Sequence, residues 1–181
     1  MAVSSKMEMF EAQLLRPATP ADADWCFVVL PKEVSDVLPR RGRTSVAVKL
    51  NGQRFTTTLE PDGQLSHWLK LSREWQQAAK VAPGAKVTLE LSPIDELEPS
   101  LPDDFKVELE ADADALATWQ ATTTLARVDW VHWIESAKQA KTRASRITSA
   151  CDQLAKGKKR VCCFDSSGYY DKSLKAPDVM Q

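Results

Sequence analysis

Residues 45–71 read SVAVKLNGQRFTTTLEPDGQLSHWLKL, a stretch in which apolar and polar side chains alternate through three short segments. Alternation with a period of two is typical of strands that bury one face. Asn51-Gly52 separates the first two segments and is the strongest short signal for a hairpin turn. Pro61-Asp62-Gly63 separates the second and third segments, and we interpret it as a three-residue loop. The stretch therefore predicts a three-stranded antiparallel meander.

The two turns also predict which residues face each other across the strands. We expect Val48 to lie opposite Phe55. Val46 should then lie opposite Thr57, and Thr57 should face His67 across the second turn. All five side chains would point to the inner face, where Thr57 and His67 would be polar residues among apolar ones.

Segments of the same kind lie on both sides of the meander, so six short strands are expected between Phe10 and Leu91. In the strand before the first short helix, the same alternation favours Trp25, Phe27 and Val29 as the inward residues. Two short helices should interrupt them, one at residues 31–38 and one that begins after Ser72, a good helix cap. After Pro93 helical patterns replace the strand patterns. The predicted fold is mainly a β barrel plus α: a small six-stranded antiparallel barrel with two short helices, followed by a C-terminal helical module.

Composition divides the chain into four parts. Residues 8–93 would form the β-barrel domain, and residues 94–104 an acidic, proline-rich connection. Residues 105–157 carry helical patterns and end at Gly157, a common residue after a helix. Residues 158–181 are expected to form a C-terminal tail.

The overall composition is that of a globular protein, with 43% apolar and 27% charged residues. No run approaches the roughly 18–20 apolar residues that a membrane span needs, and the first residues lack the apolar stretch of a secretory signal. We therefore expect a cytoplasmic protein without a membrane span. The four cysteines show neither a paired spacing nor a nearby histidine cluster, so no metal and no cofactor is expected.

The formal net charge of −1 conceals a strong asymmetry. Residues 1–137 hold 14 Lys and Arg against 21 Asp and Glu, whereas residues 138–160 hold eight Lys and Arg against Asp152 alone. Such a basic helix could bind an anionic or acidic partner weakly, with non-specific contact to nucleic acid. It could equally be the solvated side of a packed helix. The candidate residues for polyanion binding are Lys138, Lys141, Arg143 and Arg146.

Two further groups are candidates for binding an unknown small molecule. Thr57 and His67 would give the barrel interior a polar anchor, as ligand pockets have. A core histidine hydrogen-bonded to Thr57 would have the same sequence pattern. Before the third strand, the motif PRRGR could hold a phosphate or a carboxylate, or it could be an ordinary solvated loop. Its cations are Arg40, Arg41 and Arg43.

No combination of residues predicts catalysis. The chain has two histidines, no phosphate-binding loop, and neither a Gly-x-Ser-x-Gly nor a His-Glu-x-x-His motif. No catalytic residue is therefore assigned. The adjacent Cys162 and Cys163 could respond to oxidation, but the neighbours that would favour a thiolate are limited to Lys158, Lys159 and Arg160. Reduced thiols are expected.

Several motifs resemble known domains. WCFVVLP, LNGQRFTTTLEPDG followed by HWLKL, and AAKVAPGAKVTLEL together resemble an N-terminal barrel domain of unknown function. LPDDFKVEL and WVHWIESAKQAKTRASRI are similar to the helical module of the YdeI/OmpD-associated, or bacteriocin-protection, family. Members commonly carry Pro-Glu where this chain has Ala140-Lys141, yet we still expect the helical stretch to break near residues 139–142.

The resemblance implies a bacterial protein associated with protection against bacteriocins and other antimicrobial peptides, with no established catalytic step. We therefore expect a non-catalytic stress or protection protein that acts by binding a ligand or a partner. Two other functions remain open: a nucleic-acid-binding module that uses the basic helices, and an enzyme with an unrecognised barrel pocket. Salt-dependent nucleic-acid binding would favour the first. Several titratable groups converging in a deep pocket would favour the second.

Overall fold

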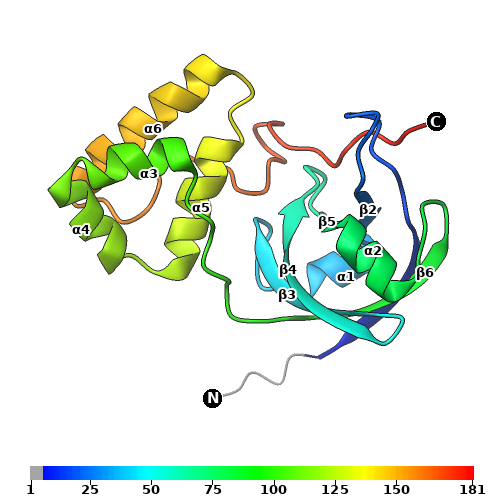
Figure 1. Cartoon of the computed structure of the whole chain (residues 1–181). Coiled ribbons are helices and arrows are strands. Elements are labelled where there is room, and N and C mark those ends of the chain that lie inside the picture. Colours follow the sequence, from blue (N-terminus) through cyan, green and yellow to red (C-terminus); the bar gives the residue numbers. More distant parts are fainter. Residues whose placement is uncertain (1–5) are drawn as a thin grey trace. The chain divides into compact units, whose positions relative to one another are not determined.

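The computed structural model describes residues 6–181 and contains the six predicted strands. They form one antiparallel sheet in the order β1-β6-β3-β4-β5-β2. A bridge between Leu15, just after β1, and Phe27 in β2 brings the two edges of the sheet together. The sheet is thus a nearly closed barrel, as predicted (Figure 1). The strands are β1 (Glu8–Gln13), β2 (Cys26–Val29), β3 (Thr44–Leu50), β4 (Gln53–Pro61), β5 (His67–Leu71) and β6 (Lys86–Pro93).

Two short helices lie among the strands, as the sequence indicates. They are α1 (Lys32–Asp36) and α2 (Arg73–Ala79). The hydroxyl of Ser72 accepts a hydrogen bond from the backbone N–H of Trp75 (3.3 Å), which fixes the start of α2. The Trp75 ring stacks on Phe55 in β4 with ring centroids 4.4 Å apart, so α2 packs against the barrel through an aromatic pair.

The predicted register is right at the first turn and wrong at the second. Val46 pairs with Thr57, as expected across the Asn51-Gly52 turn. His67, however, lies opposite Pro61 and not opposite Thr57. The Asp62 carboxylate accepts hydrogen bonds from the backbone N–H groups of residues 64 and 66 (2.7 and 2.8 Å). This side chain supports a loop of residues 62–66, longer than the predicted three residues, and β4 therefore continues to Pro61.

Strand β2 also faces the other way from the expectation. The sequence favoured Trp25, Phe27 and Val29 as inward residues, but the neighbouring set of Cys26, Val28 and Leu30 joins the barrel core. Both alternating sets are apolar, so the period of two cannot choose between them. Trp25 and Phe27 instead form an aromatic cluster with Trp68 on the outer face, with ring centroids 6.0–6.3 Å apart.

The second compact unit, Glu96–Ser166, is helical. The side chains of Asp112 and Thr123 accept hydrogen bonds from backbone N–H groups in the first turns of the second and third helices of this unit. The expected break in the long helical stretch falls at residues 136–139. Within residues 6–181, no helix is both long and apolar enough to cross a membrane. The helices of this unit are α3 (Asp103–Glu110), α4 (Ala113–Ala121), α5 (Thr124–Glu135) and α6 (Ala140–Ala155).

The C-terminal residues return to the barrel. The first unit consists of the chain up to Asp95 together with Ser167–Gln181. The backbone N–H of Ala18 donates to the carbonyl of Asp178 (2.7 Å), and the N–H of Met180 donates to the carbonyl of Arg16 (2.9 Å). Residues 178–180 therefore lie as a short extended segment along the connection that follows β1.

Candidate ligand-binding pocket beside helix α2

His67, which the sequence analysis singled out, is fully buried and holds its neighbours in place. Its Nε2 lies 2.9 Å from the carbonyl oxygen of Gly42 and must donate to it, because a carbonyl can only accept. Its Nδ1 therefore accepts the hydroxyl hydrogen of Ser35, 2.5 Å away in α1. Burial lowers the pKa of His67 and favours this neutral form. Since Ser35 and His67 are 1% and 0% exposed, the pair joins α1, β5 and the loop before β3 out of reach of solvent.

Thr57 is half-buried on β4 and is not brought together with His67. Whether either residue contacts a ligand stays a prediction.

Two of the three cations of PRRGR bind partners within the barrel unit. Arg41 donates from Nη1 to the Asp36 carboxylate (2.8 Å) and to the carbonyl of Leu65 (2.7 Å). Arg43 donates from Nε to the Glu60 carboxylate (2.9 Å), and Arg40 is half-buried. The hydrogen bond from Arg41 is the main reason that the pKa of Asp36 lies below its usual value. The motif therefore ties the loop before β3 to α1, β4 and the loop of residues 62–66.

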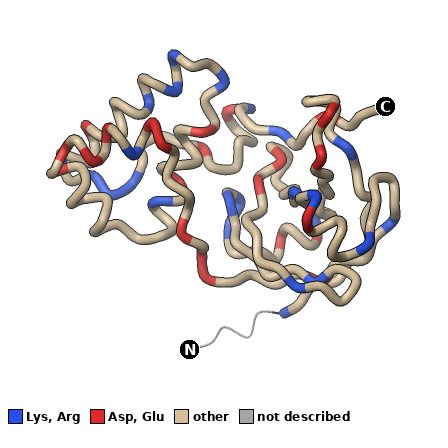
Figure 2. The backbone as a smooth tube through the Cα atoms, viewed as in Figure 1, with Lys and Arg blue, Asp and Glu red and all other residues tan. Residues whose placement is uncertain are grey.

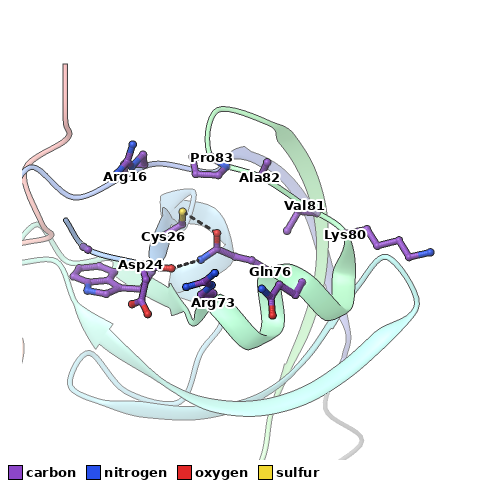
Figure 3. Close-up of a pocket in the computed structure, with 12 residues that line it drawn as sticks. Arg16, Asp24, Cys26, Arg73, Gln76, Lys80, Val81, Ala82 and Pro83 are labelled. Carbon is purple, nitrogen blue, oxygen red and sulfur yellow. Dashed lines mark hydrogen bonds between the residues drawn. The ribbon is translucent and has the colours of Figure 1, made fainter. Parts of the chain in front are cut away.

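A different group of residues, missed by the sequence analysis, surrounds a pocket of about 420 Å³ beside α2 (Figure 3). The connection between β1 and β2, the start of β2, α2 and the connection to β6 all contribute to its walls. The lining residues are Arg16, Ala23, Asp24, Trp25, Cys26, Arg73, Gln76, Gln77, Lys80, Val81, Ala82 and Pro83.

Gln76 forms the rigid floor of this pocket. Its Nε2 donates to the carbonyls of Asp24 and Leu71 (3.1 Å each), and its Oε1 accepts from the thiol of Cys26 (3.3 Å). The side-chain amide thus joins α2 to β2 and has a fixed orientation. Burial raises the pKa of Cys26, although the charge of Arg16 acts in the opposite direction. The thiol is therefore a protonated donor and not a nucleophile.

The rim of the pocket carries three cations and one carboxylate. Arg16, Arg73 and Lys80 form no ion pair with another of the residues 6–181. In Figure 3 the Cys26–Gln76 pair lies between Arg16 and Arg73, while the side chain of Lys80 extends away from the pocket. The two guanidinium groups come from different elements, the β1–β2 connection and α2, and each suits a carboxylate or a phosphate group. Asp24 supplies the carboxylate of the rim.

Trp25 gives the pocket an aromatic wall. Its ring stacks on Trp68 at 6.3 Å, and the Lys70 ammonium lies 4.6 Å from its centroid. These contacts fix the indole, so a ligand that fills the pocket would meet a rigid apolar surface beside the cationic side chains of the rim. Pockets of this kind, largely apolar with a few convergent polar groups, are typical small-molecule sites.

Figure 2 marks the Lys and Arg residues along the chain. In the helical unit, the four candidate polyanion-binding residues divide into two pairs by their contacts. Arg143 binds both oxygens of Asp104 (2.7 and 2.9 Å) and so joins α6 to α3. Arg146 donates to the carbonyl of Trp133 (2.6 Å) at the end of α5. Lys138 and Lys141 are exposed and make no ion pair within the described chain. Binding of a polyanion by these residues stays a prediction, with the two lysines as its freest cations.

The two units match two protein families, as the resemblance implied. Residues 10–91 match the family described as Domain of unknown function (DUF1905). Residues 98–157 match the family described as Bacteriocin-protection, YdeI or OmpD-Associated. No curated protein matches the chain.

Fold and matches together define a two-part protein, a small barrel domain joined to a helical module. The barrel domain matches the domain of unknown function, and the helical unit matches the bacteriocin-protection, YdeI or OmpD-associated family. The pocket beside α2 lies wholly within the barrel domain.

Proposed function

We propose that this protein is a non-catalytic binding protein that contributes to protection against bacteriocins or other antimicrobial peptides, and that its barrel pocket binds a small anionic molecule. The observation that carries the proposal is the pair Arg16 and Arg73 on two walls of the pocket, neither in an ion pair with another described residue. Such guanidinium groups stay charged and bind carboxylates or phosphates through two parallel hydrogen bonds.

The chemistry of the pocket supports binding over catalysis. Cys26 is held as a protonated thiol by burial, and the amide of Gln76 is saturated by protein partners. The buried Ser35–His67 pair has the residue types of a nucleophile and a base, but a substrate would have no access to it. The pocket thus offers positive charge, an aromatic wall and a fixed floor without an activated group.

Weak, non-specific binding of a polyanion by the helical unit is a second proposal. Lys138, just before α6, and Lys141, in its first turn, support it, because both are exposed and free of ion pairs within residues 6–181. Arg143 and Arg146 would contribute less, since each already binds partners on neighbouring helices.

The pocket can be tested by titrating the full chain with inorganic phosphate and citrate, with trehalose as a neutral control, and following tryptophan fluorescence and calorimetric heat. Arg16→Gln and Arg73→Gln should each weaken anion binding by about 10- to 100-fold, because each removes a charge-assisted hydrogen-bonding group. Arg54→Gln is the matched control, an exposed arginine on β4 outside the pocket, and should bind as the original chain does. Absence of anion binding, or equal binding by all variants, would overturn the assignment of the pocket.

The protective role needs a separate measurement. Cells that express the original chain should survive an antimicrobial peptide better than cells that lack it, and the double variant Arg16→Gln/Arg73→Gln should lose this advantage. No advantage from the original chain would refute protection. An advantage that the double variant keeps would separate protection from the pocket.

A further inference from the structure

We propose that Cys162 and Cys163 form a peroxide-sensitive dithiol site, which a hydroperoxide converts to a vicinal disulfide and a dithiol reductant restores. The site lies in the segment that follows α6, away from the pocket residues in sequence, and does not depend on the function proposed above.

The two sulfur atoms already touch. Their Sγ atoms are 2.8 Å apart, and both side chains are exposed. A disulfide bond is about 2.05 Å long, so formation of the bond needs a shift of less than about 1 Å. A peroxide can reach both thiols from solvent.

The backbone is what brings the sulfurs together. In an extended chain, neighbouring side chains point to opposite faces. Cys163 instead has a φ of 62°, in the left-handed region that residues other than glycine rarely adopt. Such a conformation is kept only where the surroundings impose it, and it is common at functional sites.

Contacts on both sides of the pair hold this segment to the helical unit. Before the pair, the indole Nε1 of Trp130 donates to the carbonyl of Lys159 (3.2 Å). After it, the Phe164 ring packs edge-on against His132 with ring centroids 5.0 Å apart. The dithiol therefore lies in a short loop anchored at both ends on α5, and not in a freely moving segment.

The remaining thiols lack these properties. Burial raises the pKa of Cys26, and it raises the pKa of Cys151 to about 11. Both are therefore protonated, and neither is accessible. The hydrogen bond with Cys162 raises the pKa of Cys163, while the charge of Lys158 acts in the opposite direction. Either sulfur can donate in this contact. Because the raised pKa of Cys163 favours its protonated form, we assign the first attack to Cys162.

The reaction balances with a hydroperoxide as the oxidant. The Cys162 thiolate attacks one peroxide oxygen, the O–O bond breaks, and Cys162 becomes a sulfenic acid while hydroxide leaves and takes a proton to become water. The Cys163 sulfur then attacks the Cys162 sulfur, the S–O bond breaks, and a second water leaves with the proton of Cys163. Two thiols have lost two electrons in total, and hydrogen peroxide has been reduced to two waters.

The resulting disulfide should be easily reduced. Adjacent Cα atoms are about 3.8 Å apart across a trans peptide, closer than the roughly 4.4–6.8 Å of ordinary disulfides. Strained and exposed disulfides have the more oxidising potentials of labile or regulatory bonds. Closing the ring also changes the backbone next to Phe164, so the oxidation state is coupled to the contact between Phe164 and His132.

The test is stoichiometric oxidation of the full chain with hydrogen peroxide, followed by thiol counting under denaturing conditions and mass spectrometry of the peptide that contains Cys162 and Cys163. We expect free thiols to fall from four to two, with this peptide lighter by two hydrogen atoms and restored by dithiothreitol. In Cys163→Ser, dimedone should trap a sulfenic acid on Cys162, and no intramolecular disulfide should form. Cys151→Ala is the matched control and should oxidise as the original chain does.

Three results would overturn the proposal. They are a reduced Cys162–Cys163 peptide when other thiols have been oxidised, irreversible oxidation of both sulfurs without a disulfide, and disulfides that join different chains only. Because both residues are exposed, circular dichroism should show that the serine variant remains folded. A negative result would then show that the disulfide does not form, and not that the variant is misfolded.

Discussion

The backbone of Leu174 occupies the space where a side chain at Gly63 would begin. A Cβ atom added to Gly63 would overlap the carbonyl oxygen of Leu174, and Gly63 also has a φ of 75°. A Cβ atom added to Gly168, which has a φ of 67°, would overlap the side chain of the same leucine. The C-terminal segment thus packs on the loop between β4 and β5, because Gly63 and Gly168 have no side chains that would overlap Leu174.

Gly63→Ala should therefore displace the C-terminal segment. We expect a loss of about 1–3 kcal/mol in the free energy of unfolding, from backbone strain and from the overlap with Leu174. Limited proteolysis should cut residues 167–181 faster. Gly84→Ala is the control, because Gly84 has a φ of 87° but nothing within 4 Å of an added Cβ. Equal proteolysis of the two variants would contradict a role for the close packing.

Stability should depend on pH through His67. Burial lowers the pKa of His67 in the folded state, so the unfolded chain takes up this proton first as the pH falls. The contribution of neutral His67 to stability is then complete above a pH of about 6.5 and is lost progressively as the pH falls below that value toward the lower folded-state pKa. Urea unfolding between pH values of about 7.5 and 5.5 should show the loss, and His67→Gln should flatten it. An unchanged slope in the variant would contradict this assignment.

Arg127 should be the polar side chain that contributes most to the stability of the helical unit. It binds the Glu98 carboxylate and the carbonyl of Thr122, and its side chain is 16% exposed. Arg127→Ala should cost about 1–3 kcal/mol of unfolding free energy, because it leaves acceptors unpaired. Lys156→Ala, which removes the exposed pair with Asp152, should stay within about 0.5 kcal/mol of the original chain. Thermal melts followed by circular dichroism would compare them, and similar melting temperatures for both variants would be the contrary outcome.

The strength of polyanion binding should depend on whether Arg143 is paired with Asp104. Asp104→Asn removes the carboxylate that binds this arginine and should strengthen weak binding to labelled single-stranded DNA or polyphosphate. Lys138→Gln/Lys141→Gln should weaken it and reduce its salt dependence. Fluorescence anisotropy at low and moderate salt measures both, with Lys172→Gln as a control in the barrel unit. If no variant binds, the charges of α6 are only a solvated surface.

The parts of the fold that the sequence predicted are those set by local signals. Asn51-Gly52 defined the first hairpin because a two-residue turn leaves little freedom of register. The second turn was predicted wrongly because the Asp62 carboxylate supports a longer loop, which a pattern of apolar residues does not reveal. In β2 two apolar faces alternate, so the choice between Cys26 and Trp25 as the inward residue depends on the rest of the barrel.

The pocket could not be predicted from the sequence, for a related reason. Arg16 and Arg73 are far apart in the sequence and stand on different elements, so only the folded barrel brings them to one rim. Of the cations that cluster in the sequence, in PRRGR, Arg41 and Arg43 bind carboxylates and a carbonyl of the barrel unit itself. Two clustered arginines therefore help to hold the fold, and ligand binding by PRRGR stays a prediction. The candidate pocket is formed by residues that are dispersed in the sequence.

The return of residues 167–181 to the barrel has a consequence for synthesis on the ribosome. All six strands emerge before the four helices of the second unit, but the segment that covers Gly63 and pairs with residues 16–18 emerges after α6. A nascent chain that has just completed α6 thus carries every strand of the barrel and still lacks the hydrogen bond from Met180 to Arg16 at the pocket wall. Folding of the barrel unit would begin first and finish last, with the helical module able to form in between.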